Sequence, residues 1–228
     1  EVKLLKEMAS NQGKEMTGPL HIGLIPTVGP YLLPYIVPTL KETFPDLEVF
    51  LYEAQTHQLL EQLETGRLDC AIVARVPETE AFIEVPIFDE KMLLAVSDQH
   101  PWASESKIAM NTLKGQEMLM LDDGHCLRNQ TLDYCFTAGA KEDSHFQATS
   151  LETLRNMVAA NAGITFMPEL AVLNEGTRTG IKYIPCHSPE PARTITLVYR
   201  PGSPLRNRYE RVASAISEQV KSILSNKK

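Results

Sequence analysis

The sequence predicts an α/β fold of two lobes that are joined by crossing strands. Short apolar runs alternate with amphipathic segments along the 228 residues, which is the order expected when helices cover a largely parallel sheet. With 43% apolar and 22% charged residues, the chain can bury one large core or two small ones. No glycine- or serine-rich linker marks a boundary, so we expect the lobes to be joined by strands rather than by a flexible tether.

The first third of the chain alternates strands with helices. We expect strands at 20–25, 47–54 and 68–74 and helices at 32–40 and 57–66. Gly66 is suited to end the second helix. Pro34 and Pro38 count against the first helix, because proline removes a backbone donor. Strand, helix, strand, helix, strand predicts that the three strands pair in parallel.

The rest of the chain adds strands and two further helices. We expect extended chain at 82–97, strands at 117–121, 164–168, 181–185 and 193–200, and helices at 151–163 and 206–223. Ser150 is placed to cap the first of these helices, which should end near Gly163. The strand at 117–121 is where a second sheet could begin.

Charge and composition exclude several classes of function. A net charge of −7 and a pI near 5.4 argue against binding of a phosphate backbone by this chain. Residues 18–40 hold no Asp, Glu, Lys or Arg, but they include five prolines, whose lost backbone bonds lipid cannot replace. No secretory signal opens the sequence. We therefore expect a cytoplasmic protein that does not bind a membrane.

The four cysteines have different settings. Cys70 lies inside an apolar strand, where a small buried core residue is expected. Cys186 lies at a strand end beside His187 and could be exposed, but the sequence around it suggests no pocket. Neither is chosen as a site.

Cys126 is predicted to lie in the first turn of a helix that follows a turn at residues 122–124. Free backbone N–H groups, His125 and Arg128 would all favour its thiolate, whereas Asp122 and Asp123 would oppose it. A half-buried structural cysteine explains this local pattern equally well.

The spacing of Cys126 and Cys135 has a geometric consequence. Nine residues of helix turn through about 900° and rise about 13.5 Å, so the two sulfurs would face opposite sides. A disulfide needs Cα atoms within about 7 Å, so this pair could bridge only if the helix unwound. A zinc site of His125, Cys126, Cys135 and His145 matches no common ligand spacing. We expect neither a metal nor another cofactor.

Several segments carry a resemblance to a known family. They are GPLHIGLIPTVGPYLLP, EAQTHQLLEQLETGRLDC, LDDGHCLRNQ, ATSLETLRNMVAANAGIT and LVYRPGSPLR, together with the cysteine pair in GHCLRNQTLDYC. The chain resembles, over almost its whole length, the regulatory domains of the OxyR family of LysR-type transcription regulators. The likeness to LysR-type effector domains in general is loose, whereas the paired cysteines are specific to the peroxide sensors.

The resemblance implies a periplasmic-binding-protein-like fold of two Rossmann-like subdomains. Subdomain I would comprise 14–88 plus 196–228, and subdomain II, with the redox cysteines, would comprise 89–195. Residues 1–13 would be the end of a linker. The winged helix-turn-helix expected before it is not in the sequence, so we expect a fragment of such a regulator.

The resemblance also implies residue roles. Cys126 would be the peroxidatic cysteine and Cys135 the resolving one, forming a reversible disulfide. Thr27 and Thr56 match the hydroxyls that hold hydrogen peroxide, and both follow predicted strands. Further residues that match positions shaping the pocket are His125, Arg128 and Arg193. Where some relatives carry Asp three residues after the reactive cysteine, this chain has Asn129, so no carboxylate role transfers.

A regulator of this kind is not an enzyme. Its partners would be hydrogen peroxide, further copies in a dimer and tetramer, DNA through the helix-turn-helix domain, thiol reductants such as glutaredoxin, and RNA polymerase. It would activate oxidative-stress genes. Three alternatives stay open: an effector domain that binds a small organic co-inducer between its lobes, a thiol peroxidase that turns over, and a periplasmic solute-binding protein.

Overall fold

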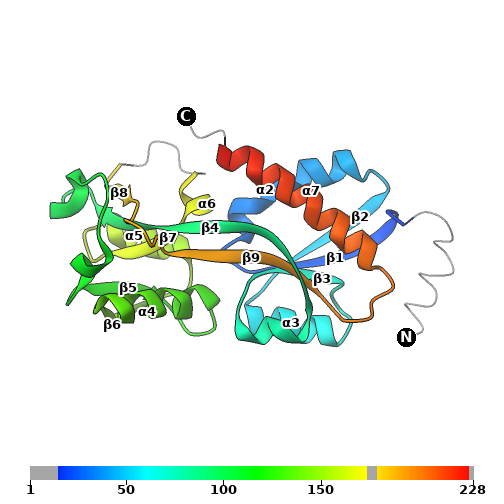
Figure 1. Cartoon of the computed structure of the whole chain (residues 1–228), viewed down its shortest axis with the longest axis horizontal. Helices are drawn as coiled ribbons and strands as arrows, with labels where there is room; N and C mark the ends of the chain where they lie inside the picture. The colour runs from blue at the N-terminus through cyan, green and yellow to red at the C-terminus, as the bar shows by residue number, and fades with distance from the viewer. Residues whose placement is uncertain (1–14, 174–178, 226–228) are drawn as a thin grey trace. The chain divides into compact units, whose positions relative to one another are not determined.

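The computed structural model describes residues 15–173 and 179–225 of the chain, and it divides into two compact α/β units (Figure 1). The first unit contains the described residues up to Ile25, then Leu32–Phe88, and the chain from Ile195 onward; the second contains Pro26–Tyr31 and Asp89–Thr194. Strands β4 (Ile83–Ser97) and β9 (Ala192–Tyr199) each have residues in both units. The predicted fold class, two lobes with strands that cross between them, is confirmed. The expected linker at 1–13 lies outside the described residues.

The first unit is built on a mostly parallel sheet. Strand β1 (Gly18–Leu24) pairs in parallel with β2 (Leu47–Glu53) and β3 (Cys70–Ala74), and β9 pairs antiparallel with β3. The predicted parallel pairing is therefore confirmed. Every residue of β3 is buried. A central strand that is covered on both faces must be apolar throughout, which explains the sequence CAIVA.

Within the described residues, the helices that belong wholly or largely to the first unit are α2 (Gly29–Thr43), α3 (Thr56–Glu64) and α7 (Arg206–Ser225). Helix α2 forms despite its internal Pro34 and Pro38. Both prolines lie on the exposed face, while the residues at 32, 36 and 40 are buried. An apolar stripe at helical spacing thus offsets the backbone bonds that the prolines remove.

The second unit holds the C-terminal half of β4, which pairs antiparallel with β7 (Thr165–Pro168) and β8 (Ile181–Ile184). A separate two-stranded parallel sheet joins β5 (Glu117–Leu121) to β6 (Lys141–Ala148), at the place where a second sheet was anticipated. Its helices are α4 (Cys126–Ala138), α5 (Leu151–Ala159) and α6 (Glu169–Leu173). Single 3-10 turns occupy Pro77–Ala81, Pro101–Ser104 and Met110–Leu113.

Three details of the second unit depart from expectation. Strand β6 and helix α6 were not predicted. Helix α5 is capped by the Ser150 side chain, which accepts from the backbone N–H of Thr153 as predicted, but it ends at Ala159, earlier than expected. Asn161 has a φ of 60°, a left-handed conformation that closes the helix before Gly163.

Among residues 15–173 and 179–225, no helix has the length and apolar character needed to cross a membrane.

Candidate functional site

The Cys126 thiol lies at the start of a helix that follows a strand after a short turn. Strand β5 ends at Leu121, Gly124 takes a φ of 92°, and α4 begins at Cys126 with His125 as its N-cap residue. The predicted first-turn position is thus confirmed. The side chain is nevertheless only 7% exposed, so a reactant must be small to reach the sulfur.

Cys135 lies two and a half turns further along the same helix. It is buried, and its sulfur is 3.1 Å from the Sδ of Met118 on β5. Burial raises the pKa of the Cys135 thiol to about 12, because a thiolate there would lose its hydration. Both thiols are free. As long as α4 is intact, Cys135 is therefore a neutral thiol rather than a nucleophile.

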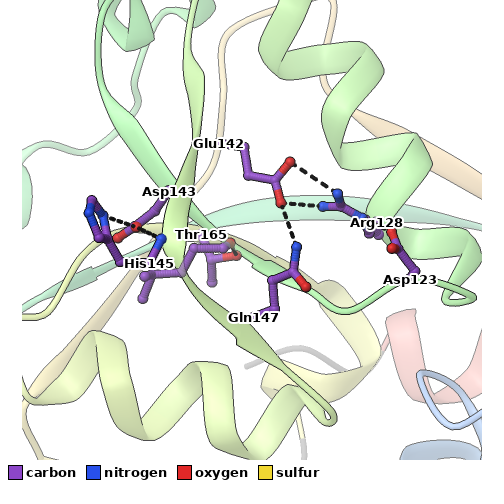
Figure 2. A network of polar contacts seen from close by, with 8 residues as sticks. Asp123, Arg128, Glu142, Asp143, His145, Gln147 and Thr165 are labelled. Atoms are coloured by element: carbon purple, nitrogen blue, oxygen red, sulfur yellow. Dashed lines mark hydrogen bonds and ion pairs between the residues drawn. The ribbon is translucent and has the colours of Figure 1, made fainter.

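The Arg128 side chain, expected to support the Cys126 thiolate, is engaged by carboxylates (Figure 2). Its Nη1 and Nη2 atoms donate to the two oxygens of Glu142 on β6, at 2.6 and 3.0 Å, and its Nε atom donates to Asp123 at 2.9 Å. The Gln147 amide donates to the same Glu142 carboxylate at 3.4 Å. This set of contacts ties the first turn of α4 to the neighbouring strand.

The two histidines near this sheet differ in burial. His125 is buried, and its Nε2 atom lies 3.1 Å from a carboxylate oxygen of Asp122. His145 is exposed and contacts Asp143 on its own strand. The alternative zinc set that combined both histidines with the two cysteines gains no support from this arrangement.

Thr27 and Arg193 are joined in a buried network of the second unit. The Nη1 and Nη2 atoms of Arg193 donate to the hydroxyl and the carbonyl oxygen of Thr27, at 2.9 and 3.0 Å. On its other side, Arg193 pairs with Glu90, whose carboxylate lies 2.8 Å from Nε and 2.7 Å from Nη2. A second oxygen of Glu90 accepts from the backbone N–H of Leu170 at 3.0 Å.

Thr56 is the first residue of α3, in the first unit. Its hydroxyl oxygen is buried and has no hydrogen-bond partner within the described part of the chain. Buried hydroxyls are nearly always paired, so this one is chemically suited to receive a small polar ligand.

The other two cysteines do not join these groups. Cys70 is buried in β3, as predicted. The expectation that Cys186 could be exposed is wrong, because it forms a parallel bridge with Ile108 and is fully covered. Burial raises the pKa of its thiol to about 11.

Two acidic residues of the site were missed from the sequence. Glu90 lies on β4 among alternating buried residues, between Phe88 and Met92. A charge at an inward position of an alternating strand was the available signal, since such a charge needs a partner. Glu142 gave no comparable signal, because most residues of its strand are polar.

Comparison with known protein families identifies residues 13–221 with the model of the LysR substrate binding domain. The chain is 89% identical over 228 residues to the "Hydrogen peroxide-inducible genes activator" of Haemophilus influenzae, covering 100% of this chain and 76% of that protein.

Solved structures give the same result. A crystal structure of the oxidized form of OxyR has a TM-score of 0.84 and 63% identity, over 91% of this chain and 98% of the other. A hydrogen peroxide-bound cysteine mutant of OxyR from Corynebacterium glutamicum has a TM-score of 0.89 and 31% identity, over 97% of this chain and 71% of the other.

Proposed function

The chain belongs to the LysR substrate binding domain family, with OxyR-type peroxide regulators among its relatives, and from this premise we propose that it is the peroxide-sensing regulatory part of a DNA-binding transcription activator. The observation that carries the proposal is a pair of cysteines nine residues apart on one helix, in a chain so similar to a hydrogen peroxide-inducible activator. Cys126 is the oxidised thiol in this proposal, and Cys135 resolves it.

The first step oxidises Cys126. Its thiolate attacks one oxygen of hydrogen peroxide, the O–O bond breaks, and an S–O bond forms. Sulfur is oxidised to sulfenic acid, while the departing oxygen takes up a proton and leaves as water. The proposed peroxide-binding groups are the hydroxyls of Thr27 and Thr56, with His125, Arg128 and Arg193 shaping the pocket. Hydroxyl donors suit this step because charge develops on the departing oxygen.

The second step forms the bridge. The Cys135 sulfur attacks the sulfenic sulfur, the S–O bond breaks, and water leaves as the S–S bond forms. Two residues nine positions apart on a helix have Cα atoms about 13.5 Å apart along its axis, well beyond the reach of a disulfide. Helix α4 must therefore unwind, which also brings Cys135 out of the environment that keeps it protonated.

Unwinding of α4 gives the oxidation a structural output. A disulfide that traps the unwound segment biases a two-state element. In the proposal, this change alters contacts between copies in a dimer or tetramer, and through them the DNA-binding domains and RNA polymerase. Thiol reductants such as glutaredoxin return the bridge to two thiols, which suits the reducing cytoplasm.

Thiol counting tests the proposal. One equivalent of peroxide should remove two of the four free thiols in the unmodified chain and leave the Cys126→Ser variant with all its thiols. The variants Cys70→Ser and Cys186→Ser should still lose two. A coupled assay with excess reductant should show slow recycling of the chain. A thiol peroxidase would instead turn over many times per chain. An unchanged thiol loss in Cys126→Ser would overturn the assignment.

A further inference from the structure

The buried carboxylate of Glu90 contacts Arg193, one of the proposed pocket residues, and the backbone N–H of Leu170. Glu90 and Arg193 both have side chains that are 1% exposed. A charge taken out of water must be paired and hydrogen-bonded to be tolerated, and here each oxygen of the carboxylate has a partner: one meets Arg193 and the other meets the Leu170 N–H. The carboxylate therefore holds Arg193 in one orientation.

The orientation of Arg193 fixes what Thr27 can do. A hydroxyl has one donor and two acceptor sites. Because Thr27 Oγ1 accepts from Nη1 of Arg193, its own proton must point away from the guanidinium. Thr27 is thereby set to donate to a ligand.

The guanidinium of Arg193 also has an N–H donor that its contacts with Glu90 and Thr27 do not use. Arginine has five N–H groups. Within the part of the chain that the structure describes, hydrogen bonds to Glu90 and Thr27 use three of those of Arg193, and the second N–H of Nη2 belongs to the ion pair with Glu90, whose oxygen lies 2.7 Å from that nitrogen. The remaining N–H is on Nη1, the atom bonded to the Thr27 hydroxyl. Two donors thus lie side by side, both placed by the same carboxylate.

We propose that Glu90 is a positioning residue for the peroxide reaction, which it serves by holding Arg193 so that Thr27 donates its hydroxyl proton to the departing oxygen. The inference rests on the proposed function, because it needs Cys126 to react with a hydroperoxide. Glu90 touches neither the thiol nor the oxidant in this role. It acts on the step in which the O–O bond breaks and the departing oxygen acquires negative charge.

The structure supplies a matched control one residue away. Asp89 accepts from Thr194 at 2.7 Å on the exposed side of the same two strands. Neighbouring residues of a strand point to opposite faces, so Glu90→Gln and Asp89→Asn remove one charge each from the same place in the fold. Only the first should affect the reaction.

The experiment compares two reactions of Cys126. After a timed pulse of hydrogen peroxide, N-ethylmaleimide labelling of tryptic peptide 115–128 measures the Cys126 that is still reduced. In parallel, iodoacetamide alkylation measures the thiolate itself, because iodide departs without a proton. Glu90→Gln should lower the rate constant with peroxide about 10- to 100-fold, the range for loss of an oriented donor, and change alkylation less than about two-fold. Asp89→Asn should leave both rates unchanged.

A second variant and a second background make the result specific. Glu90→Asp keeps the charge but cannot reach both partners, so the peroxide rate should fall about three- to ten-fold, and this variant decides the matter if Glu90→Gln does not fold. In a Thr27→Val background, Glu90→Gln should have less than about a three-fold further effect, since the donor that it positions is already gone.

The outcomes separate two kinds of failure. If the unmodified chain reacts with peroxide and folded Glu90 variants match its rate, the positioning role is overturned while the proposed function stands. If peroxide and alkylation rates fall by the same factor, Glu90 acts on the thiol and the inference is also overturned. If neither the unmodified chain nor Asp89→Asn loses reduced Cys126, the proposed function fails and the inference falls with it.

Discussion

The Glu142→Gln substitution should accelerate formation of the Cys126–Cys135 bridge. In the reduced chain, the paired oxygens of Glu142 hold Arg128 and with it the first turn of α4. Charge-assisted hydrogen bonds contribute about 1.5–3 kcal/mol. Glu142 is 24% exposed, so solvent screening reduces this to about 1–2 kcal/mol. Loss of the contact destabilises the helical state, from which α4 must unwind.

The magnitude follows from that free energy. If the contact is broken before the bridge closes, 1–2 kcal/mol corresponds to a rate increase of about 5- to 30-fold. It also corresponds to a reduction potential lower by about 20–40 mV for this two-electron couple, because the reduced form is the one destabilised.

The assay is a peroxide pulse followed by acid quenching at timed intervals and mass spectrometry of the bridged peptides. The matched control is Asp123→Asn, which removes the other carboxylate on Arg128. Asp123 is 89% exposed, so this change should alter the rate less than about two-fold. A folded Glu142→Gln chain that forms the bridge no faster than the unmodified chain would refute the view that this contact restrains α4.

Three further predictions concern stability and the remaining cysteines. Because the pKa of the Cys135 thiol is raised in the folded chain, this thiol loses its proton at a lower pH in the unfolded chain than in the folded one. Its contribution to stability is therefore complete below about pH 9 and is lost as the pH rises toward 12. Thermal unfolding of the reduced chain should show this loss of stability, and Cys135→Ala should make the loss smaller. Arg208→Met should lower the free energy of unfolding by about 3 kcal/mol, because buried Arg208 donates to the carbonyl oxygens of Glu15, Thr17 and Pro19. Urea unfolding measures this difference. The control is Arg206→Met at an exposed position, which should change the free energy of unfolding little. Cys70→Ser should lower the unfolding midpoint, because it places a hydroxyl inside fully buried β3, and it should leave the peroxide response intact. An unfolding midpoint equal to that of the unmodified chain would contradict this.

Local signals in the sequence were sufficient for most elements. The apolar run at 117–121 corresponds to β5, and the turn at residues 122–124 predicted a helix with Cys126 in its first turn, as α4 has. Strand β6 could not be predicted, because KEDSHFQA is mostly polar and only Phe146 and Ala148 are apolar. It is a strand because it pairs with β5 and receives Arg128, and these are tertiary interactions that local pattern does not encode.

The residues of the candidate site likewise differ in whether local sequence could predict them. Cys126, Cys135 and the threonines after β1 and β2 follow from local spacing and from resemblance. Glu90 was missed because its partner Arg193 lies 103 residues away in the sequence. The burial of Cys186 likewise depends on Ile108, a distant segment. Strand order alone was sufficient to predict the parallel pairing of β1 with β2 and β3, whereas single contacts between side chains or strands far apart in the sequence could not be predicted.

The most direct test of the peroxide switch is a non-reducing tryptic map of the chain before and after one equivalent of hydrogen peroxide. Trypsin cleaves after Arg128, between the two cysteines, and so separates peptide 115–128 from peptide 129–141. The proposed function predicts that these peptides appear joined only after peroxide, with Cys70 and Cys186 still reduced. If the two peptides stay separate and Cys126 remains reduced, the chain does not sense peroxide through this pair.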